Sequence, residues 1–176
     1  MFDEHKLVAN EEKTEIYAPK ETFNILGIKV LDKEFDLAKG PLCKVLYKLK
    51  HKQAKLLKKI RTKAFPKEVA YQIALKFVHN LLYGNPRHPN QTNWVSNAFS
   101  IITTEETLRY LDKKCTDFLR TIKSGKQGNA RFRVTYEELK QDGYIPLVYH
   151  FYHREKLNAE MELNMENYRK SLLENK

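Results

Sequence analysis

Residues 66–84 read PKEVAYQIALKFVHNLLYG and predict a helix that is apolar around most of its circumference. Pro66 suits the first helical position, which needs no backbone N–H, and Gly84 suits the position just past a helix end. A helix that is apolar nearly all round belongs at the centre of a core. We therefore expect residues 66–83 to be the structural hub. The apolar positions are Val69, Ala70, Ile73, Ala74, Leu75, Phe77, Val78, Leu81 and Leu82.

The preceding residues 40–65 read GPLCKVLYKLKHKQAKLLKKIRTKAF and contain no acidic residue. Gly40-Pro41 favours a helix start, and Phe65-Pro66 favours its end, because proline disfavours helix in the residue before it. The spacing of three and four between apolar residues predicts one apolar stripe along this helix, interrupted at Gln53 and Ala54. The stripe consists of Leu42, Val45, Leu46, Leu49, Leu56, Leu57 and Ile60.

Net charge is concentrated in this helix. The chain carries a formal net charge of +10, and residues 41–67 alone hold ten basic residues and no acidic one. Like charges at helical neighbour spacing repel, so phosphates or acids from elsewhere in the chain are expected to compensate them. The acidic N-terminal segment is one source of such acids. A solvated lysine face that only aids solubility is the alternative interpretation.

A concentrated basic surface is typical of proteins that bind the phosphate backbone of nucleic acids. Two arginines flank Phe132 on a segment, residues 131–134, that we predict to be extended, so both would point to one face. We therefore predict two groups of phosphate contacts. The first is Lys44, Lys48, Lys52, Lys55, Lys59, Arg61 and Lys63, and the second is Arg131 and Arg133.

The predicted fold is mainly α with a few short β-strands. Residues 22–31 alternate around Gly27 and predict one or two short strands, followed by a turn at residues 32–39. Thr103 and Glu106 have the spacing of a capping box, which would begin a helix at that point. That helix has a narrow apolar seam, Leu108, Leu111, Cys115, Phe118 and Ile122. We expect Cys43 and Cys115, both on apolar stripes, to be reduced core residues.

Residues 135–156 resemble a helix-turn-helix unit at the level of the motif. Thr135 and Glu138 form a second capping-box pattern, Gly143 follows, and Pro146 begins the last helix. The second helix begins with aromatic residues rather than the Arg, Asn and Gln that usually read bases. Two helices that pack at a corner are therefore the alternative to a DNA-reading unit. We expect the last helix to continue through residue 176.

Signatures of catalysis and cofactor binding are weak. The sequence has neither a glycine-rich phosphate-binding loop nor a nucleophile motif, and we predict no cofactor and no metal site. The carboxylates of Asp32, Glu34 and Asp36 cluster in sequence and leave open a metal-dependent nuclease. No apolar run approaches the roughly 20 residues of a membrane span. Reduced cysteines and an acidic N-terminus favour the cytoplasm, nucleoid or nucleus.

With 41% hydrophobic and 31% charged residues, the composition is that of a globular chain. We expect a polar arm at residues 1–21, one helical domain at residues 22–156 and an amphipathic helix at residues 157–176. The leading hypothesis is a non-enzymatic nucleic-acid-binding protein, DNA or RNA, without a membrane partner. The alternatives are an interaction subunit that docks a protein partner through residues 157–176, in an assembly that can include RNA, and the nuclease.

Overall fold

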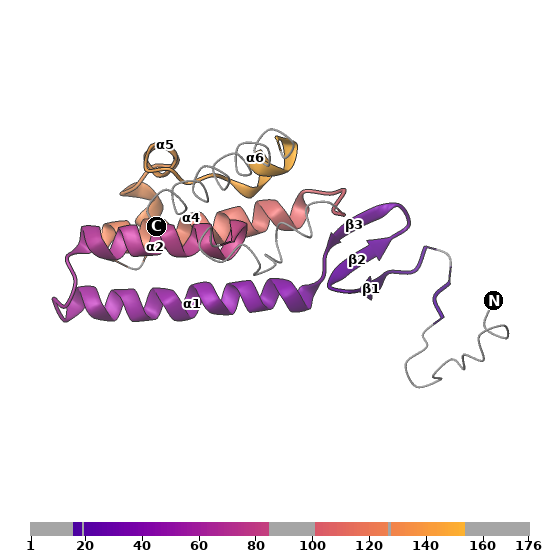
Figure 1. Cartoon of the computed structure of the whole chain (residues 1–176), viewed down its shortest axis with the longest axis horizontal. Coiled ribbons are helices and arrows are strands. Elements are labelled where there is room, and N and C mark those ends of the chain that lie inside the picture. Colours follow the sequence, from indigo (N-terminus) through magenta and orange to yellow (C-terminus); the bar gives the residue numbers. More distant parts are fainter. Residues whose placement is uncertain (1–15, 19, 85–100, 127, 154–176) are drawn as a thin grey trace, which may run out of the picture.

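The computed structural model describes residues 16–18, 20–84, 101–126 and 128–153 (Figure 1). Within them it is mainly helical with one small sheet, as the sequence predicts. Most of the predicted arm at residues 1–21 and all of the helix predicted at residues 157–176 lie outside the described residues. The elements are β1 Phe23–Ile25, β2 Ile28–Leu31, β3 Glu34–Leu37, α1 Lys39–Arg61, α2 Lys67–Tyr83, α4 Glu106–Ser124, the 3-10 helix η3 Ala130–Phe132, α5 Tyr136–Gln141 and α6 Leu147–Tyr152.

The sheet is antiparallel in the order β1-β2-β3. Leu26 and Gly27 join β1 to β2 with φ values of 49° and 87°. Positive φ at both central residues is what a tight type I′ hairpin turn requires. The predicted strands at residues 22–31 are confirmed. The predicted turn at residues 32–39 is wrong beyond its first residues, because Glu34–Leu37 form β3, in which Asp36 and Leu37 are buried.

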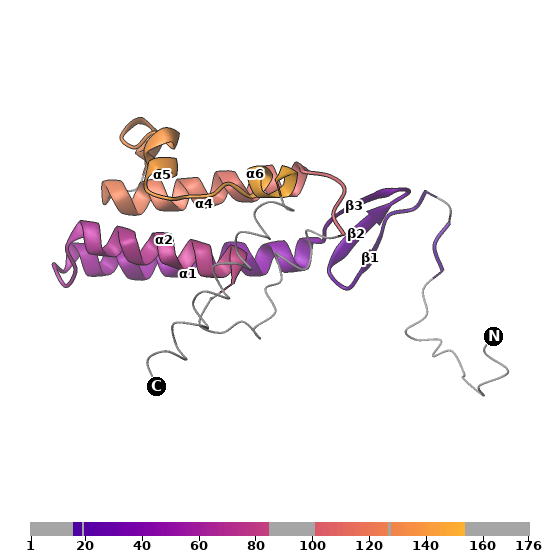
Figure 2. The same cartoon turned by 45° about the horizontal axis from the view of Figure 1, so that its top comes forward.

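The core lies between α1, α2 and α4, which pack against one another. In Figure 1, α2 returns along α1 and α4 begins beside the sheet; the turned view in Figure 2 places α4 above the α1–α2 pair. Ala70, Ala74, Val78 and Leu82 of α2 are completely buried, and their small or medium side chains allow close approach of the neighbouring helices. The predicted hub at residues 66–83 is confirmed.

The chain reverses between α1 and α2 through a helix-ending motif. Lys63 has a left-handed φ of 55°. Its N–H donates to Ile60 O at 3.1 Å, and Ala64 N–H donates to Lys59 O at 3.0 Å. These are the two hydrogen bonds of a Schellman motif, which glycine usually completes. Pro66 is the N-cap of α2, one position before the first helical position that the sequence predicted for it.

Helix α4 has the predicted seam but not the predicted start. Leu108, Leu111, Cys115, Phe118 and Ile122 are all buried. The helix begins at Glu106, and no side chain caps its first turn. The capping box predicted at Thr103 is wrong, because its hydroxyl accepts a hydrogen bond from the N–H of a β3 residue instead, at 2.9 Å.

The segment after α4 is not a strand. Residues 130–132 form η3, so the strand predicted at residues 131–134 is wrong. The capping box at Thr135 is confirmed: its hydroxyl accepts from Glu138 N–H at 3.2 Å, and the Glu138 carboxylate accepts from Thr135 N–H at 3.2 Å. Buried Leu139 fixes α5 against the core.

The helix-turn-helix unit expected near residues 135–156 is not confirmed. Helix α6 packs against α4, and its Leu147 and His150 are buried. Helix α5 also packs against α4, so the same long helix holds both short helices. Helix α6 ends at Tyr152, with His153 as the C-terminal cap, so the prediction of one helix from Pro146 through residue 176 is wrong.

Candidate nucleic-acid interface

Helix α1 turns its apolar stripe inward. Val45, Leu49, Leu56 and Leu57 are buried, and the remaining stripe residues are half-buried. The predicted stripe is therefore confirmed. Cys43 is exposed, so its predicted place in the core is wrong, whereas Cys115 on α4 is buried as expected.

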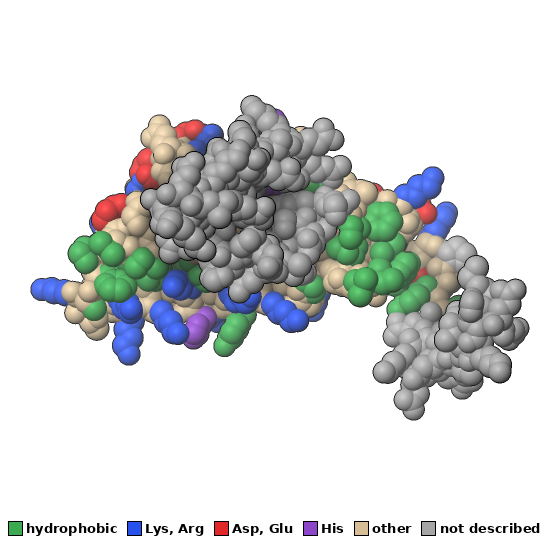
Figure 3. Space-filling model, in the orientation of Figure 1, with side chains coloured by type: hydrophobic (Ala, Val, Ile, Leu, Met, Phe, Trp, Pro, Cys, Tyr) green, Lys and Arg blue, Asp and Glu red, His purple; other side chains and the backbone are tan. Residues whose placement is uncertain are grey.

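Five lysines follow one side of α1. They are separated by four, four, three and four residues, and a helix of 3.6 residues per turn brings such positions to one side. We call Lys44, Lys48, Lys52, Lys55 and Lys59 the lysine row. Lys52 is half-buried and the other four are exposed. Figure 3 shows Lys and Arg side chains along the lower edge of the molecule, the edge that α1 forms in Figure 1.

Within the part of the chain that the structure describes, the lysine row has no carboxylate partner. The ion pairs found there join residues of α4, residues of α5 and the residues directly beside these two helices. Two lysines of the row instead lie over aromatic rings. Lys52 Nζ is 5.2 Å from the centroid of Phe77, and Lys59 Nζ is 4.2 Å from that of Phe65. These contacts hold the aliphatic parts of the two lysine side chains against the protein. They do not neutralise the positive charges, as a carboxylate would.

Arg61 and Lys63 do not extend the row. Arg61 is exposed, but it follows Lys59 by two positions, so the two residues lie about 160° apart around the helix axis. Lys63 lies past the end of α1, in the left-handed turn. Both belong to the same end of the molecule as Lys59. Their contribution to an anion site there is electrostatic rather than part of one aligned row.

The second predicted patch is separate from the first. η3 packs against α4, and in Figures 1 and 2 the chain after α4 lies on the far side of the bundle from α1. Arg133 is exposed and donates from Nη1 to Gly128 O at 3.3 Å. The side chain of Arg131 lies outside what the structure describes. The predicted alternation of the two arginines on an extended segment is wrong, because the backbone there is helical.

An exposed aromatic pair lies on the outer face of α1. The rings of Tyr47 and His51 are nearly parallel, with centroids 6.1 Å apart and planes 9° apart. Tyr47 is 69% exposed. The sequence analysis missed both residues. The signal was present, because positions 47 and 51 are one helical turn apart and both lie off the apolar stripe.

The three acidic residues at positions 32, 34 and 36 lie in different surroundings. Asp36 is buried; its Oδ1 accepts from Leu37 N–H at 2.7 Å and its Oδ2 from the Thr107 hydroxyl at 2.8 Å. It therefore joins β3 to α4. Asp32 lies in the turn between β2 and β3, and Glu34 is exposed. Among the described residues, no group of three or more His, Cys, Asp or Glu side chains is placed to hold a metal ion.

The junction of α4 with α6 is a second polar cluster, built around Asp112 of α4. Its Oδ1 accepts from the Tyr144 hydroxyl and from Leu147 N–H, both at 2.7 Å, and its Oδ2 accepts from Val148 N–H at 3.0 Å. Burial raises the pKa of Asp112, although these hydrogen bonds oppose the rise. All three contacts hold α6 and the chain that leads into it.

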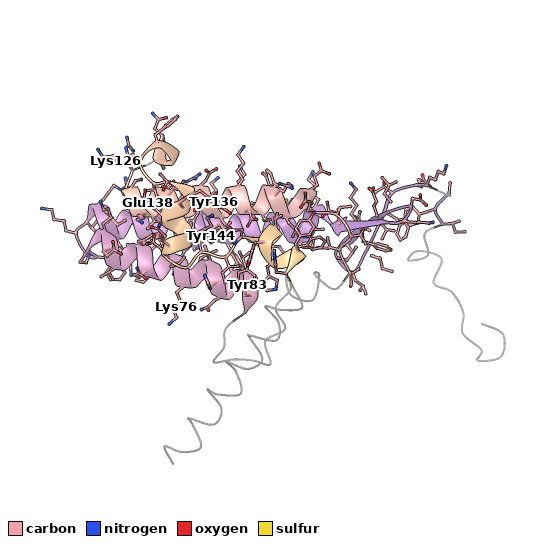
Figure 4. The ribbon with its side chains drawn as sticks, turned by 90° about the horizontal axis from the view of Figure 1, so that it is seen from above. Lys76, Tyr83, Lys126, Tyr136, Glu138 and Tyr144 are labelled. Atoms are coloured by element: carbon pink, nitrogen blue, oxygen red, sulfur yellow. The ribbon has the colours of Figure 1, made fainter. Side chains whose placement is uncertain are left out.

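Aromatic residues complete this junction. Tyr83 stacks on His150 with ring centroids 4.9 Å apart and donates to Ile145 O at 2.8 Å, and burial raises the pKa of its hydroxyl. His79 Nε2 lies 2.9 Å from Gly143 O. Figure 4 shows Tyr83 near the end of α2 and Tyr144 in the connection from α5 to α6. The polar groups named here are bonded within the fold, so the junction is structural.

Among the described residues, no helix combines the length and apolar composition needed to cross a bilayer. Comparisons with protein-family models, with curated proteins and with solved structures found no significant match to this chain.

Proposed function

We propose that the protein binds nucleic acid without catalysing a reaction, and that the lysine row makes its main phosphate contacts. The observation that carries the proposal is the alignment of five lysines on one side of α1 without a carboxylate partner among the described residues. Such a row releases condensed counterions when it neutralises phosphates, which favours binding at low salt.

The dimensions of the row suit a polynucleotide. From Lys44 to Lys59 is fifteen residues, or about 22 Å at about 1.5 Å per residue of α-helix. Successive phosphates of one strand advance by about 3.4 Å along a duplex, so the row spans roughly six of them. Five lysines over that length can each contact one of these phosphates, and helix α1 has no acidic residue to repel the strand.

The experiment is a salt titration of binding, measured by fluorescence anisotropy with labelled single strands and duplexes of DNA and RNA. If all five lysines contact phosphates, the slope of log K against log salt is about −3.5 for single strands and about −4.5 for a duplex. The test variant replaces four exposed lysines of the row by glutamine: Lys44, Lys48, Lys55 and Lys59. Its slope is expected to flatten by about 3 for single strands.

The matched control removes the same formal charge elsewhere, with glutamine at four exposed positions of the sheet, α4 and the loop after it: Lys29, Lys33, Lys113 and Lys126. The control variant is expected to keep most of the wild-type slope of log K against log salt. Affinity that does not change with salt, or an equal loss in both variants, would refute the lysine row as the binding surface.

Deletion of residues 157–176 distinguishes this proposal from an interaction subunit. Nucleic-acid binding that is unchanged by the deletion supports the proposal. Loss of a protein complex together with retained nucleic-acid affinity assigns the two functions to different parts of the chain. We further propose a reducing compartment, the cytoplasm, nucleoid or nucleus, since both cysteines are free thiols.

A further inference from the structure

We infer that the binding surface on α1 selects single-stranded nucleic acid, with a base stacked on the exposed Tyr47 ring. This inference rests on the proposed function, because it assumes that the lysine row holds the phosphates. Tyr47 is 69% exposed and lies in the middle of α1, whose opposite side is fixed in the core. The ring is therefore presented to solvent from a rigid element.

Cations surround this ring. Lys44 precedes Tyr47 by three residues, Lys48 follows it directly, and Lys55 follows His51 by four. Residues three and four apart are neighbours on a helix surface, so lysine side chains lie on either side of the aromatic pair. A strand whose phosphates contact these lysines passes over the rings, which brings a base within reach of Tyr47.

The surroundings argue against an apolar docking patch at this position. Single exposed aromatic residues are common on protein surfaces and need no explanation by themselves. Here the sequence neighbours within one helical turn include Lys44, Lys48 and Lys50, and the ring partner is His51. A hydrophobic partner surface would have to desolvate these ammonium groups, whereas a polynucleotide offers phosphates to the lysines and a π-face to the ring.

Stacking distinguishes single strands from duplexes. In a duplex both faces of an internal base are covered by its neighbours, so only phosphates are available to α1. In a single strand the base faces are accessible, and stacking on an aromatic side chain contributes about 1–3 kcal/mol per base. That range corresponds to roughly a 5- to 150-fold change in affinity.

The test measures each protein variant against each of three nucleic-acid ligands. Wild type, Tyr47→Leu and Tyr47→Phe are measured by anisotropy against a thymidine decamer, the same decamer with abasic sites, and a ten-base-pair duplex. Tyr47→Leu is expected to weaken the thymidine decamer roughly 5- to 150-fold and to leave the abasic strand and the duplex within about twofold. Tyr47→Phe, which keeps the ring, is expected to bind as the wild type does.

The matched control is Tyr110→Leu, which removes a tyrosine 43% exposed on α4, away from the lysine row. It is expected to change none of the three affinities. If the wild type binds the abasic strand or the duplex as tightly as the thymidine decamer, the inference is refuted while the proposed function stands. If no ligand binds in a salt-dependent way, the proposed function fails and this inference fails with it.

Discussion

Replacement of Asp112 by alanine removes the common acceptor of three hydrogen bonds that hold α6 to α4. The donors are the Tyr144 hydroxyl and the N–H groups of Leu147 and Val148, at 2.7, 2.7 and 3.0 Å. The two N–H groups belong to the first turn of α6, where no intrahelical partner exists. Tyr144 is buried, so its hydroxyl would lose its acceptor away from solvent.

The expected cost follows from these contacts. A hydrogen bond to a charged group contributes about 1.5–3 kcal/mol net, and the values for one shared acceptor do not add. The desolvation that raises the pKa of Asp112 offsets part of the gain. We therefore expect Asp112→Ala to lower the free energy of unfolding by about 3 kcal/mol. Asp112→Asn is expected to lower the free energy of unfolding by about half as much. The asparagine keeps one acceptor oxygen, but its NH₂ group replaces the other oxygen and would face an N–H or O–H donor.

Urea unfolding followed by far-UV circular dichroism measures both variants. Asp117→Ala, at an exposed position of the same helix, is the matched control and is expected to change the free energy of unfolding by about 0.5 kcal/mol or less. An Asp112→Ala variant no less stable than this control would refute the assignment of Asp112 as the residue that holds α6 in place.

Three further predictions concern other parts of the fold. Lys63→Gly is expected to raise the free energy of unfolding by about 1 kcal/mol, because glycine adopts the left-handed φ of 55° without strain. Lys63→Ala keeps the strain and should show no such increase in the same urea experiment. The exposed Cys43 thiol is expected to react with Ellman's reagent in the native protein, whereas Cys115, whose pKa is raised by burial, should react only on unfolding; equal rates would contradict the structure. Partial burial alone would raise the pKa of Asp142, but a hydrogen bond from Lys123 at 2.6 Å helps to hold it below its usual value. The stability from this pair is therefore present above the unfolded-state pKa and lost as pH falls through the lower, folded-state pKa. In a pH series of unfolding curves, Asp142→Asn should be at most about 1 kcal/mol less stable than wild type at pH 7, because solvent screens this partly exposed pair. The difference should shrink as pH falls below the unfolded-state pKa of the carboxyl.

Elements with a strong apolar period were predictable from the sequence. The apolar period of residues 66–83 predicts a buried helix, which the structure confirms. The buried seam of α4 was predicted correctly at every position. The two capping-box patterns had different outcomes. Thr135 caps α5, whereas the Thr103 hydroxyl accepts from Phe35 N–H. That partner is 68 residues away, so no local rule reveals the competition.

The candidate site was predictable to the extent that it follows helical spacing. The lysine row is aligned because α1 is a regular helix, and its alignment could be computed from residue numbers alone. The arginine patch was not predictable. Residues 130–132 form a 3-10 helix, and a sequence pattern this short is compatible with either a strand or a 3-10 helix. The exposure of Tyr47 and His51 follows from the same spacing, because both positions lie off the apolar stripe that faces the core.

The absence of acidic residues from α1 has a consequence for how the protein responds to its ionic medium. Added electrolyte screens the mutual repulsion of the lysines and should make the free protein more resistant to unfolding. The same electrolyte competes with a polynucleotide for those lysines and should weaken the complex. Heat resistance and affinity are therefore expected to move in opposite directions as ionic strength rises. A bound strand, by acting as a local counterion, should protect the fold most in dilute buffer.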